Sequence, residues 1–268
     1  MKTLSENRCF GGIQGVYSHA SDATGTDMTF GLFLPEHATG GILWYLSGLT
    51  CTHENAMTKA GLQAWASEAG LAVAFPDTSP RGEDVPDADT YDMGQGAGFY
   101  VDADTGDWAR HFRMQSYILD DLPKVVFDGF DLDPDRQSIT GHSMGGHGAL
   151  TLALKSPGRF RSVSAFAPIC NPSASDWGIP QLTAYTGDPA SHDATVLLAG
   201  GKPLPPCLID TGTEDQFFDK LGTAAFATAL AETRTEAMLN LRRGYDHSYF
   251  FVSTFVPEHI AFHAEHLA

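Results

Sequence analysis

The stretch Gly141-His142-Ser143-Met144-Gly145 does most to indicate the fold of this chain. It stands between Ser138-Ile139-Thr140, which is typical of the end of a strand, and a helix-forming run from Gly146 to Lys155. A serine at such a turn has strained backbone angles, and the glycines two positions away leave it clear of bulky neighbours. The pattern therefore predicts a nucleophile elbow at Ser143. A glycine-rich turn with an incidental serine is the alternative.

The size and composition of the chain favour one globular unit. Of its 268 residues, 43% are hydrophobic and 18% are charged, and α/β folds commonly reach this length without dividing. We expect a single domain over residues 1–268. No apolar run approaches the roughly 18 residues that a transmembrane helix needs, and Met1–Arg8 does not resemble a signal peptide. A soluble, cytoplasmic protein with no membrane partner is expected.

Charge and cysteine usage exclude several other classes of protein. A formal net charge of −17 repels phosphate backbones, so nucleic acid is not an expected partner. The four cysteines are scattered without a C-x-x-C pair, which argues against both a zinc site and a disulfide framework. They are Cys9, Cys51, Cys170 and Cys207, and we expect reduced thiols at all four.

Six apolar runs outside the elbow predict the sheet. They are Phe30–Leu34, Ile42–Leu46, Leu71–Phe75, Ser162–Ala167, Cys207–Asp210 and Met238–Leu241. Short buried strands that alternate with helices indicate an α/β fold with a mostly parallel central sheet and helices on both faces. Ligands of such sheets bind beyond the carboxyl ends of the strands, and Ser143 follows one of those ends.

The segment from Asp77 to Asp107 is too polar and too rich in glycine to form a core element. It carries nine acidic residues against the single base Arg81. An EF-hand loop counted from Asp102 would need a glutamate where Arg113 stands, so we expect no calcium site. Two interpretations remain open, namely a solvated excursion over the sheet and a wall of the substrate pocket.

A serine hydroxyl is a poor nucleophile near neutral pH, so it needs a base that takes its proton. In a sheet of this kind the chain order is serine, acid and histidine, each on a loop after a later strand. His247 lies in a glycine-led loop after the run Met238–Leu241 and is the predicted base. His259, His263 and His266 share one face of the C-terminal helix at a spacing that could hold zinc. Without a carboxylate or cysteine identified beside them, a solvated face is expected.

The acid should follow the run Cys207–Asp210. Asp215 lies in the next loop, from which its side chain can reach a histidine on a neighbouring loop, and it is the predicted acid. Glu214 and Asp210 are the alternatives. Each of the three could instead cap the helix expected near Phe217.

An oxyanion hole needs two backbone N–H groups. We expect one from Met144 and one from Leu49, which lies in the glycine turn after Ile42–Leu46. Cys51 would then lie near the pocket, where a thiol modifier would block access, although an inert buried thiol is the alternative. His142 and Trp177 are further pocket candidates.

Six separated blocks resemble the S-formylglutathione hydrolases, also called esterase D, of the α/β-hydrolase fold. They are Gly11-Gly12-Ile13-Gln14 with Tyr17 and His19, Leu46-Ser47-Gly48-Leu49-Thr50-Cys51-Thr52, Asp77-Thr78-Ser79-Pro80-Arg81-Gly82, Gly96-Ala97-Gly98-Phe99-Tyr100-Val101-Asp102-Ala103, Gly141-His142-Ser143-Met144-Gly145-Gly146-His147-Gly148-Ala149 and Asp246-His247-Ser248-Tyr249-Phe250-Phe251. The resemblance implies hydrolysis of S-formylglutathione to formate and glutathione, a step of formaldehyde detoxification, without a cofactor or metal. By position, it makes Ser143 the nucleophile, Asp215 the acid and His247 the base.

The resemblance also implies a homodimer and places the acidic, glycine-rich segment at the rim of the active site. The chain departs from the family after Trp177-Gly178, where Ile179-Pro180-Gln181-Leu182 replaces the usual continuation with Lys-Ala-Phe, so substrate preference could differ. A general short-chain carboxylesterase of the same fold is the alternative function. A ligand-binding protein that keeps the fold without the reaction is a third hypothesis.

Overall fold

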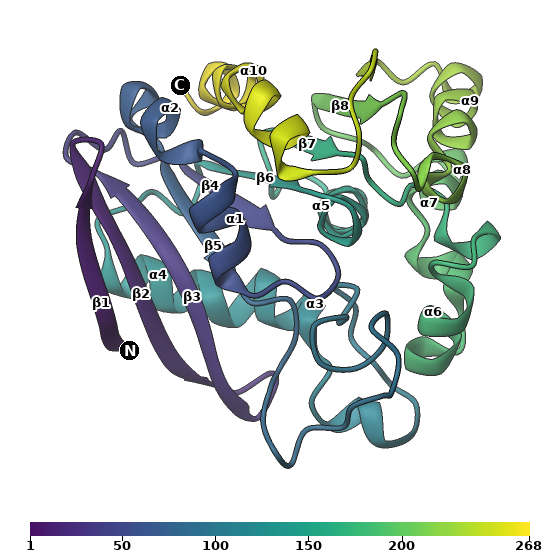
Figure 1. Cartoon of the computed structure of the whole chain (residues 1–268), viewed down its shortest axis with the longest axis horizontal. Helices are drawn as coiled ribbons and strands as arrows, with labels where there is room; N and C mark the ends of the chain where they lie inside the picture. The colour runs from purple at the N-terminus through teal and green to yellow at the C-terminus, as the bar shows by residue number, and fades with distance from the viewer.

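The computed structural model describes all residues, 1–268, and its centre is a nine-stranded sheet in the order β1-β2-β3-β5-β4-β6-β7-β8-β9 (Figure 1). The strands are β1 (Lys2–Cys9), β2 (Gly12–Ser21), β3 (Thr26–Pro35), β4 (Ile42–Leu46), β5 (Ala72–Pro76), β6 (Gln137–Gly141), β7 (Val163–Phe166), β8 (Cys207–Gly212) and β9 (Met238–Arg242). The pairs from β5 through β9 are parallel, whereas β1, β2 and β3 join them as an antiparallel extension.

Helices connect the parallel strands and pack against the sheet. They are α1 (His53–Lys59), α2 (Leu62–Ala69), α3 (Met114–Ser116), α4 (Leu122–Gly129), α5 (Met144–Lys155), α6 (Ile179–Thr186), α7 (Ala194–Ala199), α8 (Phe218–Leu221), α9 (Thr223–Thr233) and α10 (Tyr249–Leu267). α5 packs on β4, β6 and β7, and α10 packs on β6, β7 and β8 and beside α2 (Figure 1). The predicted fold class is confirmed. None of the helices is both long and apolar enough to cross a membrane.

The apolar runs correspond to strands because their residues are buried. Every residue of β4, β5, β6 and β7 is buried, as expected of parallel strands with both faces covered. The sequence did not predict β1 and β2. β1 is exposed along seven of its eight residues, so it carries no apolar signal. On β2 the buried positions are Gln14, Gly15, Tyr17, His19 and Ser21, which do not alternate in hydrophobicity.

The expected solvated histidine face on α10 is wrong for two of its three residues. His259 and His263 are buried, and hydroxyl groups on β7 and the preceding loop contact both ring nitrogens of His263 and Nδ1 of His259. His263 contacts the hydroxyls of Ser162 and Ser164, each at 2.8 Å, and His259 Nδ1 contacts Ser164 at 2.8 Å. A carboxylate also lies close, since Asp210 Oδ2 is 3.7 Å from His259 Nε2. No group of side chains in the chain is arranged to hold a metal ion.

His147 of α5 makes the fold sensitive to acid. It is fully buried, its Nε2–H donates to the carbonyl of Phe99 at 3.1 Å, and burial together with the nearby charges of His192 and Lys155 lowers its pKa to about 3. The unfolded chain takes up a proton at this side chain below about pH 6.5, whereas the folded chain does not. The stabilising contribution of neutral His147 is therefore present above pH 6.5 and is lost progressively as the pH falls toward 3.

We expect the free energy of unfolding of the native chain to fall more steeply with acid than that of His147→Gln. The difference should approach about 1.4 kcal/mol per pH unit below roughly pH 6, because one proton separates the two states. Urea unfolding at several pH values between 7 and 4 measures both slopes. Other buried histidines make both curves fall, so only the difference is diagnostic. Parallel curves would contradict the prediction.

Candidate active site

The turn between β6 and α5 holds Ser143 in a strained conformation. Its φ is 59° and its ψ is −119°, and its N–H donates to the carbonyl of Phe166 at 2.9 Å. A Cβ at Gly141 would overlap the carbonyl of Gly145, and a Cβ at Gly145 would overlap the carbonyl of Leu46. The two flanking glycines are therefore required by close backbone approach, as a nucleophile elbow demands.

Ser143 lies in the wall of a cavity of about 270 Å³ beyond the carboxyl ends of the strands. The cavity is lined by Gly48, Leu49, Thr50, Cys51, Tyr91, His142, Ser143, Trp177, Phe217, His247, Ser248 and Tyr249. These residues come from six separate segments of the chain. All three of the predicted pocket residues are among them, namely Cys51, His142 and Trp177.

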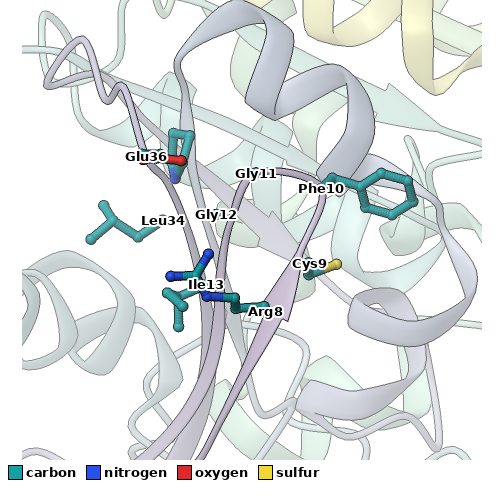
Figure 2. Close-up of a pocket in the computed structure, with 9 residues that line it drawn as sticks. Arg8, Cys9, Phe10, Gly11, Gly12, Ile13, Leu34 and Glu36 are labelled. Carbon is teal, nitrogen blue, oxygen red and sulfur yellow. The ribbon is translucent and has the colours of Figure 1, made fainter.

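A second cavity lies at the hairpin between β1 and β2, far from the elbow in the sequence (Figure 2). It contains Arg8, Cys9 and Glu36 but none of the predicted catalytic side chains, and Phe10 at the hairpin tip projects outward with 65% of its surface exposed. This cavity therefore offers no serine with a nearby base, and the elbow cavity is the candidate site.

The predicted base and acid are in contact. His247 Nδ1 lies 2.6 Å from Asp215 Oδ2, and the other carboxylate oxygen accepts a hydrogen bond from the N–H of Phe217 at 2.8 Å. The side chain of Asp215 is fully buried and that of His247 is 10% exposed. The carboxylate therefore holds the Nδ1–H tautomer of the imidazole and leaves Nε2 available toward the cavity.

The loops that carry Asp215 and His247 are tied to each other. The N–H of Thr213 donates to the carbonyl of Arg242 at 3.0 Å, the N–H of Glu214 donates to Tyr245 at 2.9 Å, and the N–H of Gly244 donates to the Thr213 hydroxyl at 2.9 Å. Both loops leave adjacent parallel strands, β8 and β9. The short distance from His247 to the acid is therefore fixed by backbone structure as well as by the side chains.

Ser143 and His247 share the cavity wall, and no hydrogen bond joins their side chains. Catalytic hydrogen bonds are often long or poorly aligned before substrate binds. The arrangement thus places a hydroxyl, an imidazole and a carboxylate around one cavity, with the contact between the last two already made.

The two alternative acids are differently placed. Glu214 is exposed. Asp210 is buried and accepts hydrogen bonds from Asn240 at 2.8 Å and from Arg242 Nε at 2.6 Å. Burial alone would raise the pKa of Asp210, but the nearby imidazole of His259 and the hydrogen bonds from Arg242 and Asn240 outweigh it and lower the pKa. Neither acid contacts His247, so the geometry favours Asp215.

Of the two predicted oxyanion donors, Leu49 lines the cavity, and Met144 directly follows Ser143 at the start of α5. Among the hydrogen bonds of the loops and helix ends, none is donated by the N–H of Leu49 or of Met144. The loop of Leu49 is held from both sides, since the N–H of Thr50 donates to Gly96 at 2.9 Å and Arg81 Nη2 donates to the carbonyl of Cys51 at 2.9 Å. Two free N–H groups on a fixed backbone can receive a negatively charged oxygen.

The acidic segment 77–107 forms part of the pocket rather than a free excursion. Its Arg81, paired with Asp77 at 3.1 Å, supports the loop of Cys51, and its Tyr91 lines the cavity. The Tyr91 hydroxyl accepts a hydrogen bond from Trp177 Nε1 at 3.1 Å. The segment thus joins the region of Trp177 to form one rim.

The stretch that departs from the family pattern supports that rim. Gln181 caps the start of α6 through the N–H of Gly178 at 2.8 Å, and its Nε2 donates to Asp92 at 2.8 Å, next to Tyr91. Tyr91, Phe217 and Tyr249 were not singled out from the sequence. Two signals were available in the sequence. Tyr91 lies in the acidic segment, and Phe217 and Tyr249 lie close to Asp215 and His247.

Cys51 lies in the wall of the cavity but is only 9% exposed. Burial raises the pKa of its thiol, against a smaller opposing effect of Tyr249. A thiol kept protonated is a weak nucleophile. The structure thus supports a location near the pocket together with low intrinsic reactivity.

Comparisons with known proteins identify the family of the chain. The family model Esterase matches residues 21–262. The chain is 59% identical to the S-formylglutathione hydrolase of Paracoccus denitrificans (strain Pd 1222), over 99% of this chain and 98% of that one. It is 46% identical to the S-formylglutathione hydrolase of Mus musculus, over 100% and 99% of the two chains.

A solved structure of an S-formylglutathione hydrolase from Agrobacterium tumefaciens superposes with a TM-score of 0.98 at 47% identity and covers all of both chains. Identity at this level over the full length of several relatives shows the family as well as the fold. The chain therefore belongs to the S-formylglutathione hydrolases of the Esterase family.

Proposed function

We propose that the chain hydrolyses S-formylglutathione to formate and glutathione through a formyl-Ser143 intermediate. The observation that carries the proposal is the 2.6 Å contact between His247 and Asp215 in the cavity that Ser143 also lines. The family membership supplies the substrate. We extend the proposal to one catalytic domain over residues 1–268 and to a homodimer, which the family resemblance implies. The four unpaired thiols suit a reducing compartment such as the cytoplasm.

In the first half of the reaction, Ser143 Oγ attacks the formyl carbon while His247 Nε2 takes its proton. Asp215 orients the imidazole and offsets the charge of the imidazolium. The N–H groups of Leu49 and Met144 hold the oxyanion of the tetrahedral intermediate. The bond from carbon to sulfur then breaks, the proton on His247 passes to the sulfur, and glutathione leaves as the thiol. Because a thiol has a reference pKa near 8.5, it leaves more readily than an alkoxide, and the demand on His247 as an acid is modest.

In the second half, His247 removes a proton from water, and the hydroxide attacks the formyl ester of Ser143. The ester bond breaks, Ser143 regains its proton from His247, and formate leaves. No redox step or cofactor is needed for either half.

The rim of the cavity suits the glutathione part of the substrate. Trp177 and Phe217 pack with ring centroids 4.4 Å apart, and Tyr91 is 60% exposed at the edge. The ammonium of Lys220 lies 5.2 Å from the centroid of the Trp177 ring. In a chain with a net charge of −17, a cation beside this aromatic wall is well placed to attract a carboxylate of glutathione.

Turnover of S-formylglutathione, followed by the loss of thioester absorbance, tests the proposal. We expect a higher kcat/KM for S-formylglutathione than for p-nitrophenyl acetate, and a decline in rate as simple ester chains lengthen from acetyl to octanoyl. The decline is expected because a site that transfers a formyl group needs room for only a single-carbon acyl group. Faster turnover of p-nitrophenyl acetate would identify a general short-chain carboxylesterase instead. Equal rates on acetyl and octanoyl esters would contradict the tight acyl pocket.

A further inference from the structure

His142, the residue before the nucleophile, is fixed in place by its backbone. Its N–H donates to the carbonyl of Leu46 at 3.1 Å, and its carbonyl accepts a hydrogen bond from the N–H of Gly145 at 2.8 Å. It also forms an isolated parallel bridge with Phe166. The side chain is 6% exposed. Strands on both sides and the start of α5 therefore hold the imidazole where it is.

That imidazole packs directly against His247. The ring centroids of His142 and His247 are 4.5 Å apart with an interplanar angle of 42°, and the Tyr249 ring lies 5.6 Å from His142. On another side of His247, Phe217 makes an edge contact at 5.1 Å and 87°. A hydrogen bond to Asp215 alone fixes one atom of the ring and leaves the ring free to rotate about that point. Contacts from His142 and Phe217 restrict that rotation.

The imidazole of His142 is only partly hydrogen-bonded and carries no charge near neutral pH. Nε2 is buried and has no hydrogen-bond partner, as is also true of Nδ1 of His147. Burial, followed by the neighbouring His247, holds the pKa of His142 well below the ordinary histidine value, while the backbone carbonyl of His247 acts in the opposite direction. His142 is therefore uncharged near neutral pH, and it adds no positive charge that would oppose protonation of His247.

We propose that His142 is a positioning residue that holds the His247 ring with Nε2 directed at Ser143. The inference rests on the proposed role of His247 as the base. It assigns no bond-making step to His142, which acts only through the ring that it contacts.

The test compares His142→Ala with His142→Phe, which restores a flat ring of similar size. We expect the alanine variant to lose about 10- to 100-fold in kcat on S-formylglutathione, the effect of a small misplacement of a reacting group. The loss should appear in kcat more than in KM, because a misplaced base impairs proton transfer rather than ground-state binding. The phenylalanine variant should regain most of the lost kcat. Fluorophosphonate titration of Ser143 counts the folded sites in every sample, so that misfolded protein does not enter kcat.

His147→Ala is the matched control, since it removes a second buried histidine of the same motif that does not line the cavity. It should lower stability and leave kcat per titrated site unchanged. Full kcat in His142→Ala would overturn the inference, and so would a phenylalanine variant as slow as the alanine one. Neither result would affect the proposed function, which would fail only if the native chain did not turn over S-formylglutathione.

Discussion

Replacing Ser143 by alanine should lower kcat on S-formylglutathione by roughly 10⁶-fold, the loss that follows removal of the nucleophile in serine hydrolases. Alanine keeps the Cβ, so the strained turn at φ 59° is no harder to form. The hydroxyl is lost, and no neighbouring group replaces it, because the Cys51 thiol has a pKa raised by burial. Stability should change little.

Two measurements check this result. Steady-state turnover gives the loss in rate, and mass spectrometry after treatment with a fluorophosphonate shows whether one label is attached per chain. Ser253→Ala, a change at a serine on α10 whose hydroxyl only contacts the carbonyl of Phe250, is the matched control and should keep full activity and full labelling. Stoichiometric labelling of Ser143→Ala would show that the nucleophile lies elsewhere. Absence of labelling and turnover in the native chain would favour a ligand-binding protein that has kept only the fold.

The substitution Asp215→Asn should lower kcat by about 10⁴-fold while leaving the fold intact. An amide of the same shape still fits the site, but it carries no charge to offset the imidazolium. Its NH₂ group can also face Nδ1 and so stabilise the tautomer with the proton on Nε2, which cannot accept the proton of Ser143. The contact that this change disturbs is the 2.6 Å hydrogen bond to His247.

The two alternative acids provide controls for this prediction. Glu214→Gln alters an exposed side chain next to Asp215 and should leave kcat unchanged. Asp210→Asn weakens the buried ion pair with Arg242, whose guanidinium also contacts Glu258, so it should lower the melting temperature far more than kcat. If the large loss of kcat appeared at Asp210 or at Glu214 in place of Asp215, the proposed assignment of the acid would be wrong.

Much of this fold could be predicted because the sheet is buried on both faces. Runs such as Ile42–Leu46 contain no exposed residue, and such strands are recognisable from composition alone. β1 and β2 could not be found in this way. β1 is mostly exposed, and the buried residues of β2 are mostly polar or glycine. What makes them strands is the pairing of β1 with β2 and of β2 with β3, which is a property of the folded chain.

The candidate site was predictable where it depends on local chemistry and chain order. A glycine on each side of Ser143 and a histidine loop after the last strand are sequence features. The contact of His142 with His247 is not, because it depends on how two distant loops approach. The same limit explains the histidines of α10, whose partners at Ser162 and Ser164 come from a segment about one hundred residues earlier.

The loops of Asp215 and His247, which are hydrogen-bonded to each other, are distinct from the segments that form the rim of the pocket. These loops continue neighbouring strands, so the rigid backbone of the sheet fixes the distance between the acid and the base. The aromatic rim around Tyr91 and Trp177 belongs to other segments. Mutations that reshape the rim can therefore alter which leaving group is accepted without disturbing proton transfer. Members of one family can thus differ in substrate and still share one catalytic mechanism.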